Sequence, residues 1–190
     1  MILSNAFLAH ISEDKREQTI LAHLQGTSAL AKEFARRFGG EDQAQLAGMA
    51  HDIGKYSSAF QKRLRGDPQM VDHATAGAYE CGLLGQIFAA FAVAGHHGGL
   101  PDGGTQADGS DDATFRGRMK RLECGKLAPY SAWKEEVQLP IAAVPAYAQT
   151  DLAHGMFFTR MLYSCLVDAD YLDTEAFMTG QPRPSYPISI

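Results

Sequence analysis

Hydrophobic residues along most of this chain recur at steps of three and four, the spacing that gives a helix one buried face. The first run of this kind covers residues 21–38 and stops at Gly39 and Gly40, a common way for a helix to end. Further helices are expected over about residues 41–53, from residue 72 or 73 to about 94, and over about 150–171. Because no segment alternates convincingly in the manner of a strand, the pattern predicts an all-α fold.

Glycines and other small residues divide the middle of the chain into two parts. The third expected helix is rich in alanine and glycine, which predicts close packing against another helix. These small residues are Ala74, Ala76, Gly77, Ala78 and Gly82. Residues 98–112 hold five glycines, one proline and four aspartates, so this stretch is expected to be a long loop.

The length of 190 residues fits one domain of ordinary size. We expect residues 1–180 to form that domain. Residues 181–190 contain three prolines and no helical periodicity, which is typical of a tail or of a linker toward a further domain.

Charge and cysteine content exclude several classes of protein. Seventeen lysines and arginines against 22 acidic residues give a net charge of −5, which argues against holding nucleic acid by bulk positive charge but permits a local basic groove. The three cysteines lie far apart, which argues against a disulfide framework and a thiolate zinc site and fits a cytoplasmic protein. The most apolar stretch, residues 83–94, is too short to cross a bilayer, so no membrane association is expected.

Five of the seven histidines form an ordered set with acidic residues, and each member falls within or at the end of an expected helix. A single His-Asp doublet is uninformative, since chance alone gives about half of one in a chain of this composition. The order of the whole set is more specific. It runs His23, His51-Asp52, His73, His96-His97, and then Asp168 or Asp170.

Imidazole and carboxylate groups without thiolates are ligands suited to Mn, Ni, Co, Fe or Zn, and Mg remains compatible. Asp52 has two oxygens and could bridge two cations, whereas His51 binds only one. Two divalent ions about 3.5–4 Å apart activate water and stabilise a leaving oxygen, which is the arrangement for hydrolysis of phosphate esters. The set therefore predicts a site for two divalent transition-metal ions.

Lys55, His10 and His154 lie outside the ordered set and are interpreted separately. Lys55 follows Asp52 by three positions, so it would share a helix face with it, either as a solvated lysine or as a cation that holds a phosphate beside the metals. His10 and His154 are interpreted as ordinary structural histidines, because neither belongs to the ordered set.

Taken together, these residues resemble the HD superfamily of metal-dependent phosphohydrolases. More narrowly, they resemble the HD nuclease domain of the CRISPR type I nuclease-helicase. The resemblance rests on the whole set of motifs between about His23 and Glu175. These are His23, the stretch from His51 to Lys55, Asp72-His73-Ala74, the stretch from Gly95 to Gly99, and the late stretch from Ser164 to Asp173.

The resemblance implies a compact helical bundle with a central two-metal pocket. By position, one metal would be held by His23, His51, Asp52 and Asp170, and the second by Asp52, His73, His96 and His97. Asp170 is chosen because the family's last motif reads small residue, Asp, then an aromatic or basic residue. Asp168 is retained as the alternative. Asp52 and Lys55 would be the catalytic residues.

The resemblance also implies an endonuclease or exonuclease that hydrolyses single-stranded DNA in type I CRISPR interference, an antiviral defence. Its partners would be a helicase domain, fused or separate, and the guide-RNA surveillance complex. The chain has no Walker-type Gly-Lys-Ser/Thr, so the ATP-driven step would belong to that helicase. Candidate strand contacts, which could equally be solvated charges, are Lys62, Arg63, Arg65, Arg116, Arg118, Lys120 and Arg121.

Two other functions are compatible with the same residues. An HD phosphohydrolase acting on nucleotides or cyclic nucleotides would use the same metals, but it would favour a closed pocket with groups that read the base. A non-catalytic HD binding module usually accompanies lost ligands, and none is visibly lost here. The tandem histidine and the glycine-rich loop favour a strand as the substrate.

Overall fold

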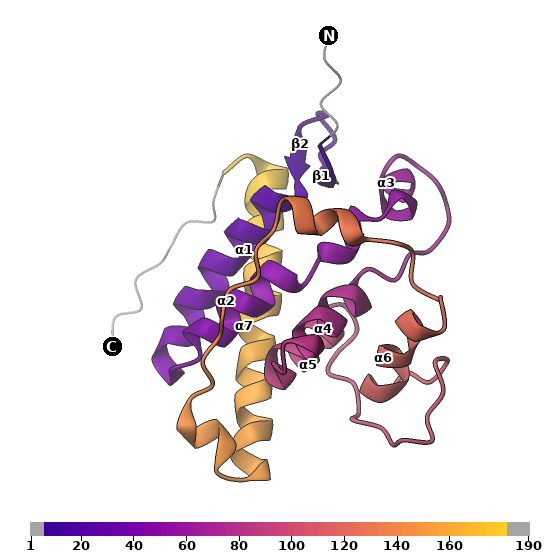
Figure 1. The fold of residues 1–190 in the computed structure, drawn as a ribbon. Coiled ribbons are helices and arrows are strands. Elements are labelled where there is room, and N and C mark those ends of the chain that lie inside the picture. The colour runs from indigo at the N-terminus through magenta and orange to yellow at the C-terminus, as the bar shows by residue number, and fades with distance from the viewer. Residues whose placement is uncertain (1–5, 182–190) are drawn as a thin grey trace.

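Seven α-helices account for the hydrophobic periodicity in residues 6–181, the part of the chain that the computed structural model describes (Figure 1). The helices are α1 (Ile20–Ala35), α2 (Glu41–Ala50), α3 (Ser58–Leu64), α4 (Ala74–Leu83), α5 (Ile87–Gly95), α6 (Phe115–Glu123) and α7 (Leu152–Thr179). Short 3₁₀ turns lie at Arg36–Phe38, Ile53–Tyr56, Ser131–Glu135 and Ala146–Gln149. The expected all-α class is confirmed, with one small two-stranded sheet added.

The helices pack in two adjoining groups. Helix α1 packs extensively on both α2 and α7, while α4 packs along α5 (Figure 1). Contacts from α5 to α7 and α2 join the groups, and α6 lies outside α4. The helices that carry the ordered histidines therefore meet in the middle of the molecule.

Alanine dominates the core where these helices cross. Ala44, Ala47 and Ala50 on α2 are fully buried, as are Ala89, Ala90 and Ala92 on α5. A Cβ atom at Gly77 of α4 would overlap the carbonyl oxygen of Ala50, so these two helices touch through their backbones. The predicted close packing of small residues is confirmed at Gly77, whereas Gly82 faces open space.

Three helix boundaries differ from the sequence pattern. The third expected helix is two helices, because Gly85 has a positive φ of 71° and the chain turns between α4 and α5. Helix α2 ends at Ala50 and passes into a 3₁₀ turn, which is shorter than the expected 41–53. Helix α7 continues to Thr179 and ends at Gly180, whose φ of 73° is typical of a helix stop.

A short hairpin precedes α1. Strand β1 (Leu8–Ile11) pairs antiparallel with β2 (Glu17–Thr19), with His10 opposite Gln18 and an irregularity between Leu8 and His10. These strands are too short to give a detectable alternation, so the sequence pattern missed them. Thr19 ends β2 and caps α1, because its hydroxyl accepts a hydrogen bond from the backbone N–H of Ala22.

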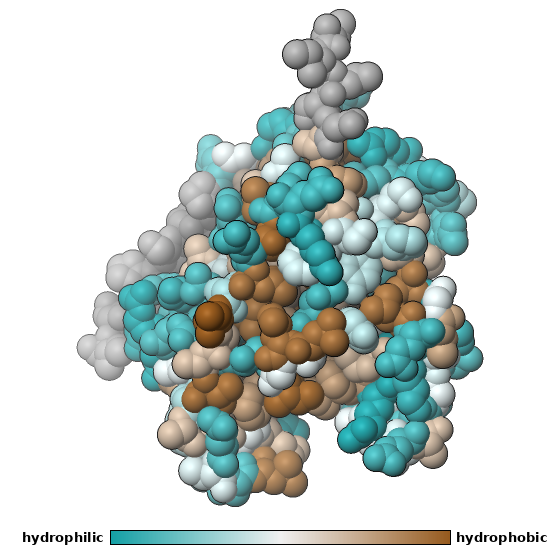
Figure 2. Space-filling model, in the orientation of Figure 1, coloured by the Kyte–Doolittle hydropathy of each residue, from teal (hydrophilic) through white to brown (hydrophobic). Residues whose placement is uncertain are grey.

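The segment between α6 and α7 crosses one face of the bundle (Figure 1). Trp133 is buried in it, and hydrogen bonds from Tyr130 to Glu80 and from Tyr56 to Glu136 attach it to the body. Hydrophobic surface gathers across the middle of this face, between hydrophilic regions above and below (Figure 2).

The stretch 98–112 is an irregular loop, as expected, and it is anchored to α6. The backbone N–H of Phe115 donates to the carbonyl of Asp102 at 2.8 Å, and Lys126 pairs with Asp111 at 2.7 Å. In residues 6–181, no helix has the length and apolar character needed to cross a membrane. Of the predicted tail at residues 181–190, residues 182–190 lie outside the described residues.

Because Gly77 and Gly82 share one helix but differ in surroundings, they give a matched pair of stability variants. Gly77→Ala should lower the free energy of unfolding by about 1–3 kcal/mol, since its methyl group must displace the Ala50 backbone. Gly82→Ala should leave it unchanged or raise it by up to about 1 kcal/mol, because alanine favours the helix. Urea denaturation of both variants measures this, and equal effects would contradict the close contact between α4 and α2.

Candidate metal centre

His23 on α1 and His51 at the end of α2 face each other inside the protein. Both side chains are fully buried, and their Nε2 atoms lie 3.2 Å apart. The Nδ1–H of His51 donates to the carbonyl of Gly48 at 2.8 Å, which directs Nε2 of that ring toward His23 and Asp52. This orientation is the one a metal ligand requires.

Asp52 occupies the centre of the cluster and is 1% exposed. Its Oδ2 atom lies 3.4 Å from Nε2 of His23 and 3.4 Å from Nε2 of His51. Its Oδ1 atom lies 3.5 Å from Nε2 of His73 and 3.5 Å from Nε2 of His96. The two oxygens therefore face two different sets of histidines.

Helix α7 contributes two acidic residues, Asp170 and Asp173, to the surroundings of His23. Asp170 Oδ1 lies 3.2 Å from Nε2 of His23, and Asp173 Oδ2 accepts a hydrogen bond of 2.7 Å from Nδ1–H of the same ring. Gln18 of the hairpin donates to Asp173 at 2.8 Å. Asp168, the alternative to Asp170, is exposed and does not belong to the cluster. A carboxylate on the far nitrogen of a ligating histidine fixes the ring and raises its basicity.

The second set lies where the start of α4 meets the end of α5. His73 precedes α4, while His96 and His97 follow α5, and the Nε2 atoms of His73 and His97 are 2.6 Å apart. His96 donates from Nδ1 to the carbonyl of Val93 at 2.7 Å, so its Nε2 faces Asp52. His96 is buried, His73 is partly exposed and His97 is exposed, so this set opens to solvent.

Two groups of four ligand atoms therefore overlap at Asp52, and within each group the atoms lie within 4.8 Å of one another. The groups are His23, His51, Asp52 and Asp170, and Asp52, His73, His96 and His97. Among the described residues, both oxygens of Asp52 and Nε2 of His96 are buried without a hydrogen bond. Buried acceptors without donors are costly, so this donor set fits divalent cations.

Lys55 lies beside the first group and is 5% exposed, which excludes the interpretation as a solvated lysine. Its Nζ is 2.6 Å from Oδ2 of Asp52, an ion pair made possible by the 3₁₀ turn that follows the doublet. The ammonium therefore places a positive charge directly beside the carboxylate that the two ligand groups share.

The hairpin contributes a residue that the sequence analysis set aside. The ring of His10 packs edge-on against His23 with 4.7 Å between centroids, and its Nε2 lies 3.5 Å from Lys55 Nζ and 3.5 Å from Thr174 Oγ1. Only the pairing of two short strands brings it there, which no local motif signals. His154 is at the far end of α7 and pairs with Asp151 at 2.8 Å.

The carboxylates control the protonation of the first group. Burial acts to lower the pKa of His23, but Asp170, Asp173 and Asp52 outweigh it and raise that pKa to about 10. Burial also acts to lower the pKa of His51, but Asp52 and Asp170 outweigh it and raise that pKa to about 9. The pKa of Asp52 lies well below its usual value, because Lys55 and the histidines outweigh its burial.

In the second group, two histidines have pKa values below the ordinary value. Burial lowers the pKa of His73 and outweighs the opposing effect of Asp52. Burial and the adjacent His96 lower the pKa of His97 to about 4. These two rings are therefore neutral near pH 7, which is the state that binds a cation.

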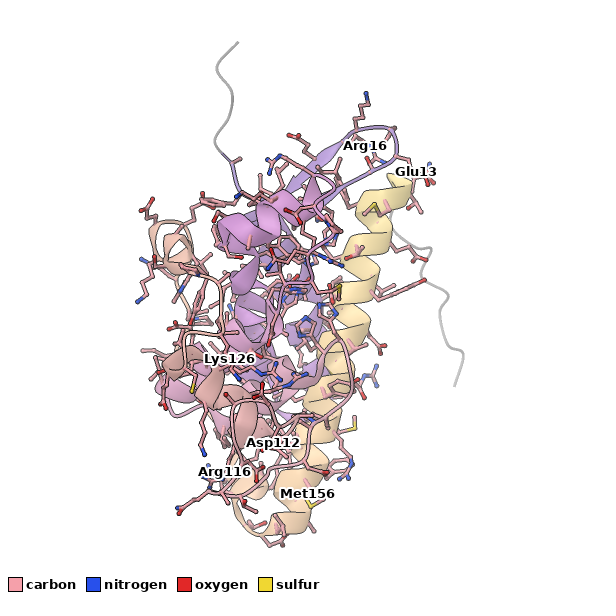
Figure 3. The ribbon with its side chains drawn as sticks, turned by 90° about the vertical axis from the view of Figure 1, so that its right-hand side faces the viewer. Glu13, Arg16, Asp112, Arg116, Lys126 and Met156 are labelled. Atoms are coloured by element: carbon pink, nitrogen blue, oxygen red, sulfur yellow. The ribbon has the colours of Figure 1, made fainter. Side chains whose placement is uncertain are left out.

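The basic residues suggested as strand contacts lie on two helices around the second group. Helix α3 is next to it, since the Phe60 ring is 5.2 Å from the His73 ring, and Lys62 on this helix is exposed. Arg63 donates to the carbonyl of Gln69, and Arg65 to that of Gln61. On α6, Arg116 is exposed at the outer edge (Figure 3). Arg118, Lys120 and Arg121 each donate to backbone carbonyls.

Metal uptake by the first group should release protons. With pKa values of about 10 and about 9, His23 and His51 carry protons at pH 7 in the metal-free protein, and a divalent ion must displace them. We expect Mn²⁺ affinity to rise with pH up to about pH 9, because protons compete with the ion until the pH reaches the pKa values of these two rings. Calorimetry in buffers of different ionisation enthalpy measures the protons released. An affinity independent of pH would be inconsistent with the cluster as the binding site.

The comparison with protein families agrees with this geometry. Residues 20–136 match the family model described as "HD domain", which covers more than half of the chain. The matched segment contains every histidine of the two groups, whereas Asp170 lies beyond it on α7. No curated protein matches the chain. HD domains are metal-dependent phosphohydrolases, and this chain belongs to the HD domain family.

Proposed function

We propose that this protein is a metal-dependent nuclease that hydrolyses phosphodiester bonds of single-stranded DNA in type I CRISPR interference. The observation that carries the proposal is the complete pair of ligand groups joined at Asp52, with Lys55 2.6 Å from the shared carboxylate. No position of either group is lost, which favours catalysis over a binding module without activity.

The ligand groups favour an arrangement in which one carboxylate serves both ions. Two divalent ions, when bound, lower the pKa of water and neutralise charge on the phosphate in the transition state. Asp52 would present one oxygen to each ion, since Oδ2 faces His23 and His51 while Oδ1 faces His73 and His96. Lys55 and the buried histidines surround that carboxylate.

Lys55 would supply the protein's own positive charge. Its ammonium lies in a buried setting where electrostatic interactions are stronger than in water. When Asp52 binds ions, the ammonium can donate to a phosphate oxygen that replaces part of its contact with the carboxylate. His10, 3.5 Å from Nζ, limits the positions that the ammonium can take.

The exposure of the second group favours a polymer over a small nucleotide. His97 is exposed and His73 partly so, which leaves room for a chain to pass across the site. Exposed Lys62 on neighbouring α3 is placed to contact backbone phosphates. The net charge of −5 gives little general attraction for DNA, which is consistent with delivery of the strand by a helicase and a guide-RNA complex.

Cleavage of circular single-stranded DNA tests this function directly. The metal-free protein is given Mn²⁺, Ni²⁺, Co²⁺, Fe²⁺, Mg²⁺ or Zn²⁺ singly, and we expect opening and then degradation of the circle with at least one ion. Asp52→Ala should reduce the rate by about 10³-fold or more and weaken metal binding, because it removes the shared ligand. His154→Ala, which is remote from the cluster, should retain full activity.

Three results would change the conclusion. Full activity of Asp52→Ala would show that the two-ion site is wrong. Bound metal without DNA cleavage would favour hydrolysis of nucleotides, which a nucleotide panel then measures. Cleavage of free DNA but not of a strand displaced by a guide-RNA complex would contradict the CRISPR role alone.

Lys55 should affect chemistry without affecting metal content. Lys55→Ala removes the ammonium beside Asp52 but none of the ligands, so we expect metal stoichiometry to stay unchanged and cleavage to slow by about 10²-fold to 10³-fold. Metal analysis and single-turnover cleavage under the same conditions separate the two effects. Loss of bound metal would indicate instead that Lys55 mainly maintains the structure of the site.

A further inference from the structure

Two arginines of α6, one helical turn apart, connect this outer helix to the elements that carry the second ligand group. Arg121 donates from Nη1 to Oδ2 of Asp72 at 2.6 Å and from Nε to the carbonyl of Ser110 at 3.2 Å. Arg118 donates from Nη1 to the carbonyl of Ala94. Both arginine side chains are partly buried, and the bond from Arg121 to the carboxylate of Asp72 joins two charged groups, which makes it stronger than a neutral hydrogen bond.

Asp72 transmits the first contact to His73. Its carboxylate accepts from the backbone N–H of Thr75 at 3.1 Å and from the Thr75 hydroxyl at 2.7 Å. These bonds fix the start of α4, and His73 is the next residue along the chain. A negative charge at a helix start is also favoured by the helix dipole.

Arg118 acts in the same way at the end of α5. Ala94 lies in the last turn of that helix, and His96 and His97 follow directly. The carbonyls of a helix end carry partial negative charge and lack intrahelical partners, so a guanidinium there is favourable. Arg118 therefore fixes the turn from which both histidines project.

We propose that Arg118 and Arg121 are positioning residues of the second metal site, and that α6 holds His73 at its ligating distance from His96 and His97. The proposal rests on the two-ion function described above. The Nε2 atoms of His73 and His97, which are 2.6 Å apart, belong to two helices whose ends are joined on the outside by these arginines. If the start of α4 and the end of α5 moved apart, the ligand atoms of His73 and His97 would become too distant to bind the same ion.

The first ligand group is independent of α6. His23 and His51 are fully buried, and their helices pack on each other and on α7 within the alanine-rich core. Loss of the arginine contacts should therefore weaken binding of the ion at the second ligand group only. General destabilisation of the fold would weaken binding at both groups.

The test is a calorimetric titration of the metal-free protein with Mn²⁺, supported by electron paramagnetic resonance of the coupled ion pair. In Arg121→Gln and in Arg118→Gln, we expect the affinity for the ion at the first ligand group to stay unchanged. The affinity for the ion at the second ligand group should fall by about tenfold or more. Arg116→Gln is the matched control, because it removes the same charge from an exposed position of the same helix (Figure 3). It should bind both ions as the wild type does.

Asp72→Asn gives a second route to the same conclusion, since it weakens the contact with Arg121 while preserving shape. It should lower the affinity for the second ion as Arg121→Gln does. The double variant of Asp72→Asn and Arg121→Gln should bind that ion no more weakly than either single variant, because both changes break the same contact. Wild-type affinity for both ions in the arginine variants would overturn the proposal, and reduced binding of single-stranded DNA in those variants would assign the arginines to strand contact instead. An equal effect of Arg116→Gln would also overturn it.

The same titration separates this proposal from the proposed function. A wild-type protein that binds a single ion would overturn the two-ion basis of both. Two ions in the wild type, with no selective loss in the arginine variants, would overturn only the role of α6.

Discussion

The buried carboxylate of Asp52 is the constraint on which the rest of the structure depends. It is 1% exposed and carries a pKa well below its ordinary value, so a negative charge is kept away from water. Such a charge is tolerated only when opposite charges and ligands surround it. Lys55 meets that requirement together with the protonated His23 and His51 in the metal-free protein, or together with the cations when they are bound. Removing any of them leaves part of the charge uncompensated.

The backbone around Asp52 is packed closely enough to hold these groups in place. A Cβ atom at Gly54, two residues after Asp52, would overlap the backbone of His73. Gly77 approaches Ala50 in the same way. These two glycines therefore let α4 approach the end of α2, which brings His73 within 3.5 Å of the shared carboxylate. The close packing of small residues and the geometry of the site are thus one feature of the fold.

Much of this arrangement could be predicted from the sequence, because helical periodicity and the order of the histidines are local signals. The structure brings together His23, His51, Asp52, His73, His96, His97 and Asp170; the order of the sequence grouped the histidines with Asp52, and the family resemblance favoured Asp170 over Asp168. His10 and Asp173 were missed, because each reaches His23 through tertiary contacts between residues 13 and 150 positions apart. The hairpin and the break at Gly85 were missed because short strands and a single glycine leave weak patterns.

The position of Asp170 on the last helix also bears on when the site can form. His23 and Asp173 are hydrogen-bonded across 150 positions, so the first ligand group depends on a contact of very long sequence separation. Such a contact requires the entropy cost of closing the intervening chain to be overcome. A growing chain that has produced all five histidines still lacks the carboxylates of α7. The complete ligand group for the first ion therefore exists only in a chain that has been synthesised through α7 and has this helix docked on α1.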